Sequence, residues 1–93
     1  MSKYTVIFEE SQLIKKQLKK LIKNKKLYAR LKEILLEMTV NPYNPTFMFE
    51  RLKGDKSGRC SKRLTQKDRI YYQVKDEIVT VFVISIEGHY DDR

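Results

Sequence analysis

The 93-residue sequence has no tryptophan and little glycine, proline, cysteine or histidine: three, two, one and one residues, respectively. So little glycine and proline excludes collagen-like and low-complexity chains. One cysteine cannot form an internal disulfide, which fits a reducing compartment, and we expect Cys60 to be a structural residue. No apolar run approaches the ~18 residues that span a bilayer. The sequence therefore predicts one cytoplasmic domain, residues 1–93, with no membrane partner.

The same scarcity limits the chemistry available to the chain. With one His and one Cys, the carboxylates form no ligand cluster at a spacing known for metal sites. The glycines at 54, 58 and 88 match neither a dinucleotide-binding fingerprint nor a P-loop. We therefore expect no metal and no cofactor. Any catalysis would be acid–base chemistry supported by cationic side chains.

Positive charge is what the sequence has in excess. Lys and Arg number 20 against 12 Asp and Glu, for a net charge of +8. A polyanion is the expected class of partner, although charge alone does not separate a nuclease from a passive binder. The basic residues between 11 and 36 fit a solvated helix face or an RNA or ribosome contact surface. The basic block at 51–63 is the better phosphate candidate.

Hydrophobic periodicity predicts an α+β fold. A β-branched and aromatic run at 3–8 indicates a strand, and two apolar stripes at helical spacing follow, ending at Asn41-Pro42. The stripes consist of Leu13, Ile14, Leu18, Leu21 and Ile22, then Leu27, Leu31, Ile34, Leu35 and Met38. Strand patterns cover 47–53, 58–64, 69–74 and 78–86, with connections short enough for hairpins. The order β-α-α-β-β-β-β implies a helix hairpin on one face of a mostly antiparallel, twisted sheet.

Three residues could perform acid–base chemistry on RNA. His89 follows the long apolar strand and suits proton transfer near neutrality, although a lone histidine near the end of a chain is usually a surface residue. Glu50 stands beside the basic block, where a salt bridge to Arg51 or Lys53 is the alternative interpretation. Arg69 lies at a strand edge of the same predicted sheet. Such a set could deprotonate a 2′-hydroxyl, stabilise charge on phosphorus and protonate the leaving 5′-oxygen.

The two-residue strand period divides the basic block between two faces. Arg59, Ser61 and Arg63 should share one face, and Cys60, Lys62 and Leu64 the other. Tyr71 and Tyr72 could stack on bases, although Tyr72 fits a core position better.

The half of the chain after residue 48 resembles the RelE/ParE toxin superfamily, in its YoeB (Txe) branch. The family pattern is E-x-L-K, S-G, S-R-R, H-R-hydrophobic-hydrophobic-Y-x-V and a final H-Y. The matching segments here are Phe49-Glu50-Arg51-Leu52-Lys53, Ser57-Gly58, Ser61-Lys62-Arg63, Asp68-Arg69-Ile70-Tyr71-Tyr72-Gln73-Val74 and His89-Tyr90. Two departures stand out, because Arg59 and Cys60 occupy positions that are often aromatic and Lys62 replaces the first arginine of S-R-R.

The resemblance implies a RelE-like fold and the toxin of a type II toxin–antitoxin system, a ribosome-dependent mRNA endoribonuclease. Glu50 would be the general base, His89 the general acid and Arg69 the cation that stabilises the transition state. The residues expected to bind RNA are Lys53, Arg59, Lys62, Arg63 and Tyr90. The expected partners are a cognate antitoxin, the ribosome and mRNA, a second copy in a homodimer, and operator DNA only through the antitoxin complex.

Two other functions fit the sequence. A toxin of the same fold could poison gyrase without cutting RNA, or the domain could bind RNA without catalysis through its charge and strand aromatics.

Overall fold

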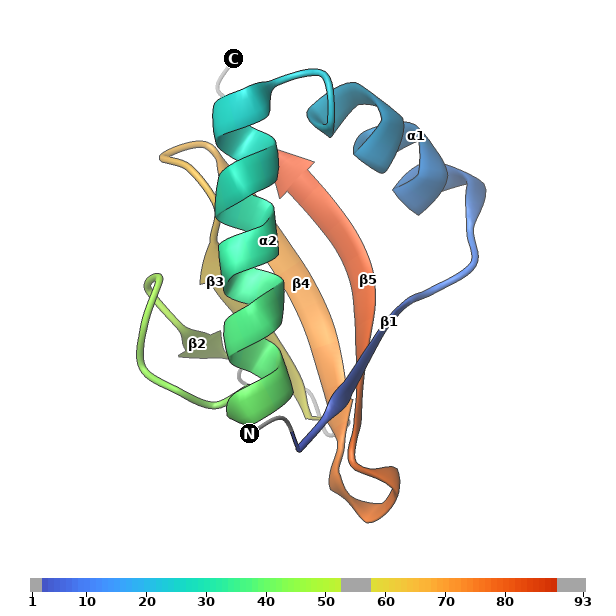
Figure 1. Ribbon diagram of the computed structural model, residues 1–93. Coiled ribbons are helices and arrows are strands. Elements are labelled where there is room, and N and C mark those ends of the chain that lie inside the picture. The colour runs from blue at the N-terminus through green and yellow to red at the C-terminus, as the bar shows by residue number, and fades with distance from the viewer. Residues whose placement is uncertain (1–2, 53–57, 89–93) are drawn as a thin grey trace.

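The computed structural model describes residues 3–52 and 58–88 and confirms the predicted order of elements (Figure 1). The elements are β1 (Thr5–Phe8), α1 (Gln12–Leu21), α2 (Lys25–Val40), β2 (Glu50–Arg51), β3 (Arg59–Arg63), β4 (Asp68–Lys75), the 3₁₀ turn η1 (Asp76–Ile78) and β5 (Thr80–Gly88). No helix among these described residues is long and apolar enough to cross a membrane.

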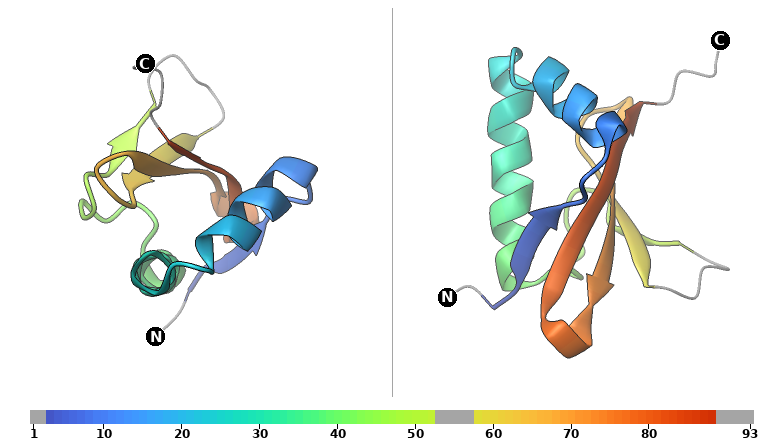
Figure 2. Two further views of the ribbon diagram at one scale, coloured as in Figure 1. Left: turned by 90° about the horizontal axis from the view of Figure 1, so that it is seen from above. Right: turned by 90° about the vertical axis from the view of Figure 1, so that its right-hand side faces the viewer.

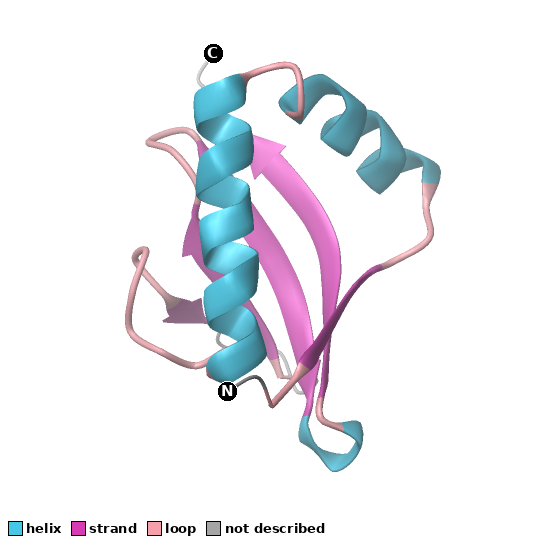
Figure 3. Ribbon diagram, in the orientation of Figure 1, coloured by secondary structure: helices cyan, strands magenta, loops and turns pink. Residues whose placement is uncertain are grey.

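The five strands form one sheet in the order β1-β5-β4-β3-β2. All neighbours are antiparallel except β1 and β5, which pair in parallel with Thr5 opposite Thr80. Both helices pack on this sheet, and α2 crosses one face of it (Figures 2 and 3). The predicted α+β fold with a helix hairpin on a mostly antiparallel sheet is therefore confirmed.

Each helix begins at a polar cap and buries part of its apolar stripe. The Ser11 hydroxyl accepts a hydrogen bond from the Ile14 amide, and the Asn24 side chain accepts one from the Leu27 amide. The stripe predictions hold best for α2. On α1, Leu13 and Ile22 are half exposed, because α1 lies beside β5 near the sheet margin, where less of its circumference is covered (Figure 1). The residues of the stripes that are buried are Ile14, Leu21, Leu31, Ile34 and Met38.

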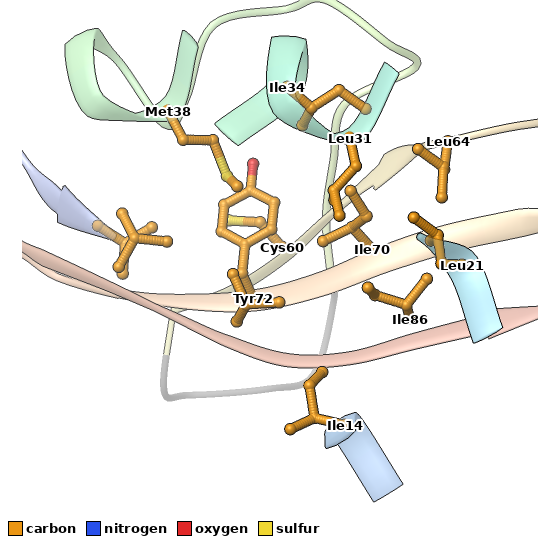
Figure 4. Packing of buried hydrophobic residues seen from close by; sticks show 13 residues of the cluster. Ile14, Leu21, Leu31, Ile34, Met38, Cys60, Leu64, Ile70, Tyr72 and Ile86 are labelled. Carbon is orange, nitrogen blue, oxygen red and sulfur yellow. The ribbon is translucent and has the colours of Figure 1, made fainter. Parts of the chain in front are cut away.

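The core lies between α2 and the inward face of the three long strands (Figure 4). Tyr72 is fully buried, as predicted, and its hydroxyl donates a 2.7 Å hydrogen bond to the Pro42 carbonyl. Cys60 is buried beside it, as expected for a structural cysteine, and burial raises the pKa of its thiol. A bulge in β5 shifts the register with β4, because Tyr71 is opposite Ser85 while Tyr72 is opposite Val83.

The strand predicted at 47–53 is wrong over most of its length. Only Glu50 and Arg51 pair as a strand, and Phe47 and Met48 both have φ of 53°, in the left-handed region. Side-chain-bearing residues seldom adopt that conformation, so the segment must be held by contacts from elsewhere in the fold.

A carboxylate at one end of the sheet joins three separate parts of the chain. Asp76 accepts hydrogen bonds of 2.8 Å from the hydroxyls of Tyr4 and Tyr43. These bonds lower the pKa of Asp76. The contact ties η1 to the start of the chain and to the segment after α2.

Candidate active site

The sheet face opposite the core carries most of the polar residues singled out from the sequence. Side chains alternate along a strand, and Cys60, Lys62 and Leu64 are buried while Arg59 is exposed and Arg63 is half-buried. The division of the basic block between two faces is therefore confirmed. We call the outer set of strand residues the polar face; it consists of Glu50, Arg59, Ser61, Arg63, Arg69, Tyr71, Gln73, Ser85 and Glu87.

Two adjacent rows across the sheet form the centre of the polar face. In one row, Arg69 is opposite Arg63 on β3 and opposite Glu87 on β5. In the next row, Ser61 is opposite Glu50 on β2 and opposite Tyr71 on β4. The sheet register therefore brings the predicted base and the predicted cation to neighbouring positions.

Glu50 and Arg69 form an ion pair across these rows. Arg69 Nη2 lies 3.4 Å from Glu50 Oε1, and the two side chains are 20% and 64% exposed, respectively. This distance exceeds the ~2.7–2.9 Å of a strong charge-assisted hydrogen bond, so the pair is loose. Arg51, the other described partner suggested for Glu50, instead places its guanidinium 4.8 Å from the centroid of the Tyr43 ring.

Two buried polar atoms beside this ion pair have no hydrogen-bond partner within residues 3–52 and 58–88. They are Ser61 Oγ and Arg69 Nη1. Native proteins rarely leave such atoms unpaired, and the cost is larger for charged groups. Arg63 adds a second positive charge directly opposite Arg69, and the carboxylates of Glu50 and Glu87 beside them offset this repulsion. The partly exposed Arg63 and Arg69 side chains are suited to an anionic ligand that accepts hydrogen bonds, such as a phosphate.

The structure places Lys62 away from the polar face, contrary to its predicted role in binding RNA. Its side chain is fully buried, and Nζ donates to the carbonyls of Asn44 and Thr46 at 2.7 and 3.1 Å. Nζ also lies 3.3 Å from Glu37 Oε1. Burial lowers the pKa of Lys62, and the Glu37 carboxylate opposes this shift. An ammonium enclosed by these acceptors cannot reach a phosphate, so we remove Lys62 from the RNA-binding set.

Three predicted site residues, Lys53, His89 and Tyr90, lie outside the described residues. The described chain ends at Gly88, which pairs with Asp68, the residue before Arg69. Among the residues that the structure does describe, no three His, Cys, Asp or Glu side chains gather closely enough to hold a metal ion.

Two residues of the polar face, Ser61 and Glu87, carry no motif in the sequence that predicts a function for them. The two-residue strand period places Ser61 on the same face as Arg59 and Arg63, and this position is the feature of the sequence from which its place at the site could have been predicted. Glu87 lies opposite Arg69 only because of the β4–β5 register, which includes a bulge that the sequence does not reveal.

Comparison with known proteins agrees with this geometry. Residues 19–90 match the family described as the YoeB-like toxin of bacterial type II toxin–antitoxin systems. No curated protein sequence matches the chain. The match to the family spans well over half of the sequence and includes every candidate site residue.

Solved structures of similar fold come from the same group of toxins. The archaeal RelE–RelB complex from Pyrococcus horikoshii contains a chain of 20% identity with a TM-score of 0.79, and the alignment covers 96% of this chain and 98% of that one. The YoeB dimer from Staphylococcus aureus has 24% identity and a TM-score of 0.76, covering 96% and 100%. The YoeB–YefM complex from Staphylococcus aureus has 25% identity and a TM-score of 0.75, covering 94% and 98%.

The sheet order, the two helices and the family match define a toxin of the RelE/ParE superfamily. Within that superfamily, the chain belongs to the YoeB-like toxin family of type II toxin–antitoxin systems.

Proposed function

We propose that this toxin is a ribosome-dependent mRNA endoribonuclease that uses metal-free acid–base chemistry. The observation that carries the proposal is the Arg69 side chain, which is four-fifths buried on the polar face, beside Glu50 and Arg63, with Nη1 unpartnered within the described residues. A cation held in this way is ready to stabilise charge that develops on a phosphate.

In the proposed reaction, the Glu50 carboxylate takes the proton of a 2′-hydroxyl. The 2′-oxygen then attacks the adjacent phosphorus, Arg69 stabilises the charge on the phosphoryl oxygens, and His89 protonates the departing 5′-oxygen. The products are a 2′,3′-cyclic phosphate and a 5′-hydroxyl end. The loose contact between Arg69 and Glu50 lets a phosphate replace the carboxylate at the guanidinium.

The other residues of the proposed RNA site position the substrate. Arg59 and Arg63 on the polar face, together with Lys53, bind phosphate groups, and Tyr90 stacks on a base. The Tyr71 ring on the same face is half-buried and offers a second stacking surface.

The proposed partners are a cognate antitoxin, the ribosome and mRNA, a second copy of the toxin, and operator DNA through the antitoxin complex. A hollow of about 860 Å³ between α1 and the ends of β4 and β5 suits an amphipathic segment of the antitoxin. Its lining includes apolar Leu13, Leu21 and Ile86. The charged side chains of the lining are of both signs: Lys16 and Lys20 on α1, and Asp68 and Glu87 on the strands. The substitution Leu13→Glu should weaken antitoxin binding, and unchanged affinity would exclude this hollow as the contact.

Cleavage of mRNA on programmed ribosomes tests the catalytic proposal. Glu50→Gln, Arg69→Ala and His89→Ala should each lose ~10²-fold or more in rate, as is typical when a positioned acid–base or charge-stabilising group is removed. Glu33→Gln, which changes an exposed carboxylate on α2, is the matched control and should cleave like wild type.

The outcome separates three functions. Full activity in His89→Ala would overturn the acid–base assignment. Intact mRNA together with gyrase-dependent DNA damage would favour the gyrase-poisoning alternative. RNA binding that survives all three substitutions, with no cleavage by wild type, would favour a non-catalytic module.

A further inference from the structure

The buried Lys62 side chain belongs to a polar network that holds the segment before Glu50. The Thr46 hydroxyl lies 3.1 Å from Lys62 Nζ and 2.6 Å from Glu37 Oε2, and the Asn44 amide donates to the same carboxylate oxygen at 2.8 Å. We call Glu37, Asn44, Thr46 and Lys62 the anchor. An ammonium has three N–H donors, and at least three acceptor oxygens lie within reach of Lys62 Nζ. All the hydrogen-bond donors of this buried ammonium therefore have partners.

The charge of the network is balanced within the anchor itself. Burial alone would raise the pKa of Glu37, but hydrogen bonds from Thr46 and Asn44 and the charge of Lys62 outweigh it, so the pKa lies below its usual value. The Glu37 carboxylate is therefore charged at neutral pH, and its charge and hydrogen bond oppose the lowering of the Lys62 pKa by burial. Removal of either side chain leaves the other buried without its counterion.

The anchor spans three parts of the fold. Glu37 comes from α2 and Lys62 from β3, while Asn44 and Thr46 belong to the connection that leads to β2. Backbone bonds extend the attachment, because the Arg63 amide donates to the Phe47 carbonyl at 2.6 Å. The Phe49 amide likewise donates to the Thr46 carbonyl at 3.1 Å. The connection is thus fixed on both sides immediately before the strand that carries Glu50.

The fixed segment contains the two left-handed residues, Phe47 and Met48. Neither is a glycine, so an unrestrained chain would relax to an extended or helical conformation. The aromatic rings around this turn also contact the ammonium, since Lys62 Nζ lies 5.2 Å from the Phe49 ring centroid and 5.9 Å from that of Phe47. Relaxation would rotate the chain two residues before Glu50 and move its carboxylate away from Arg69.

We propose that Lys62 is a positioning residue for Glu50: the anchor holds the left-handed turn that places the Glu50 carboxylate beside Arg69. This inference rests on the proposed function, in which Glu50 is the general base. A general base must lie within hydrogen-bond reach of the proton it takes, and a misplacement of about 1 Å can cost up to ~10²-fold in rate.

The variants Lys62→Met and Thr46→Val remove the central cation and its bridging hydroxyl. Thr46→Val is the milder change and serves if Lys62→Met folds poorly. Each should lower kcat of mRNA cleavage about 10- to 100-fold while KM changes less than ~3-fold, because substrate contacts on the polar face are untouched. Lys62→Arg, which keeps the cation and carries more donors, should restore most of kcat.

Two comparisons separate positioning from a general loss of stability. In a Glu50→Ala background, Lys62→Met should cause no further loss of rate, because Lys62 acts through Glu50. Val81→Ala, a core change in β5, should lower the melting temperature without lowering kcat when measured at a temperature where the protein is fully folded. An additive loss in the Glu50→Ala background, or an equal kcat loss in Val81→Ala, would overturn the proposal.

Amide hydrogen exchange tests the anchor independently of activity. In Lys62→Met, exchange of the Phe49 and Arg63 amides should accelerate, while the Glu9 amide, bonded to the Val83 carbonyl at the opposite side of the sheet, should be unchanged. Unchanged exchange at Phe49 and Arg63 would overturn the proposal. If Glu50→Ala instead cleaves like wild type, the proposed function fails, and exchange still decides whether Lys62 holds the turn.

Discussion

Replacing Arg69 with methionine is expected to make the protein more stable while abolishing cleavage. The reason is that Arg69 keeps a charged group mostly buried with one of its nitrogen atoms, Nη1, unpartnered in the described structure. It also lies directly opposite Arg63, a second cation. In the proposed reaction, the phosphate of the RNA substrate offsets this positive charge.

The magnitude follows from four contributions. An unsatisfied buried donor costs ~1–3 kcal/mol. Like charges opposite one another on a sheet cost roughly 0.2–1 kcal/mol. Loss of the contact with Glu50, which is 64% exposed, offsets at most ~1 kcal/mol, and loss of the opposite charge of Glu87, which faces Arg69 from β5, offsets at most ~1 kcal/mol more. The net gain in Arg69→Met is therefore centred on about 1.5 kcal/mol in the free energy of unfolding, and since 1 kcal/mol shifts Tm by roughly 4–8 °C at this size, on a Tm increase of roughly 6–12 °C.

Thermal unfolding followed by circular dichroism measures this effect. Lys67→Met is the matched control, because Lys67 is exposed in the turn before β4 and its replacement should change the free energy by less than ~0.5 kcal/mol. Inorganic phosphate at constant ionic strength should raise the Tm of wild type more than that of Arg69→Met. An unchanged or lower Tm in Arg69→Met would refute the reasoning.

Three further predictions concern stability and reactivity. Tyr72→Phe should lower the free energy of unfolding, measured by urea titration, by ~1–3 kcal/mol, because the Pro42 carbonyl loses its hydrogen-bond donor. The control Tyr28→Phe, which changes an exposed ring, should alter the free energy of unfolding little. Equal effects of the two substitutions would contradict this prediction. Hydrogen bonds from two tyrosines lower the pKa of Asp76 in the folded protein. The contribution of Asp76 to the free energy of unfolding is therefore fully present above the ordinary carboxyl pKa, and it is lost as the pH falls through the lowered pKa of the folded state. The stability difference between wild type and Asp76→Asn should therefore be constant at neutral pH and shrink as pH falls below about 5. A difference that stays constant in acid would argue against the Asp76 contact. The buried Cys60 thiol, with its raised pKa, should react with a disulfide reagent only as fast as the protein unfolds, and rapid labelling of folded protein would show that the thiol is accessible.

Local patterns in the sequence were sufficient to predict the element order. The helical stripe of α2 correctly placed Leu31, Ile34 and Met38 in the core, because that period is a property of neighbouring residues alone. The strand predicted at 47–53 failed for the opposite reason. Its apolar residues fit a strand, but the left-handed turn at Phe47 and Met48 accompanies tertiary contacts that local pattern does not encode.

The candidate site was predictable in part. Glu50 and Arg69 were expected on one sheet, and their contact across adjacent rows agrees with that expectation. Lys62 shows the limit of such reasoning. The strand period placed it on the same face as Cys60 and Leu64, but its charge and the family resemblance favoured a role in binding RNA. Its partner Glu37 lies on a different element, so the pairing arises only in the folded chain.

The parallel pairing of β1 with β5 determines when the domain can be completed during synthesis. Thr5 to Phe8 pair with Thr80 to Val83, so β1 is made well before its partner strand and must wait for β5 to be synthesised. Until then, β1 has no neighbour in the sheet and β4 lacks the strand with which it shares its longest pairing. Contacts between residues so distant in sequence form late and slowly. A nascent chain of this protein therefore cannot complete its sheet before β5 has emerged from the ribosome.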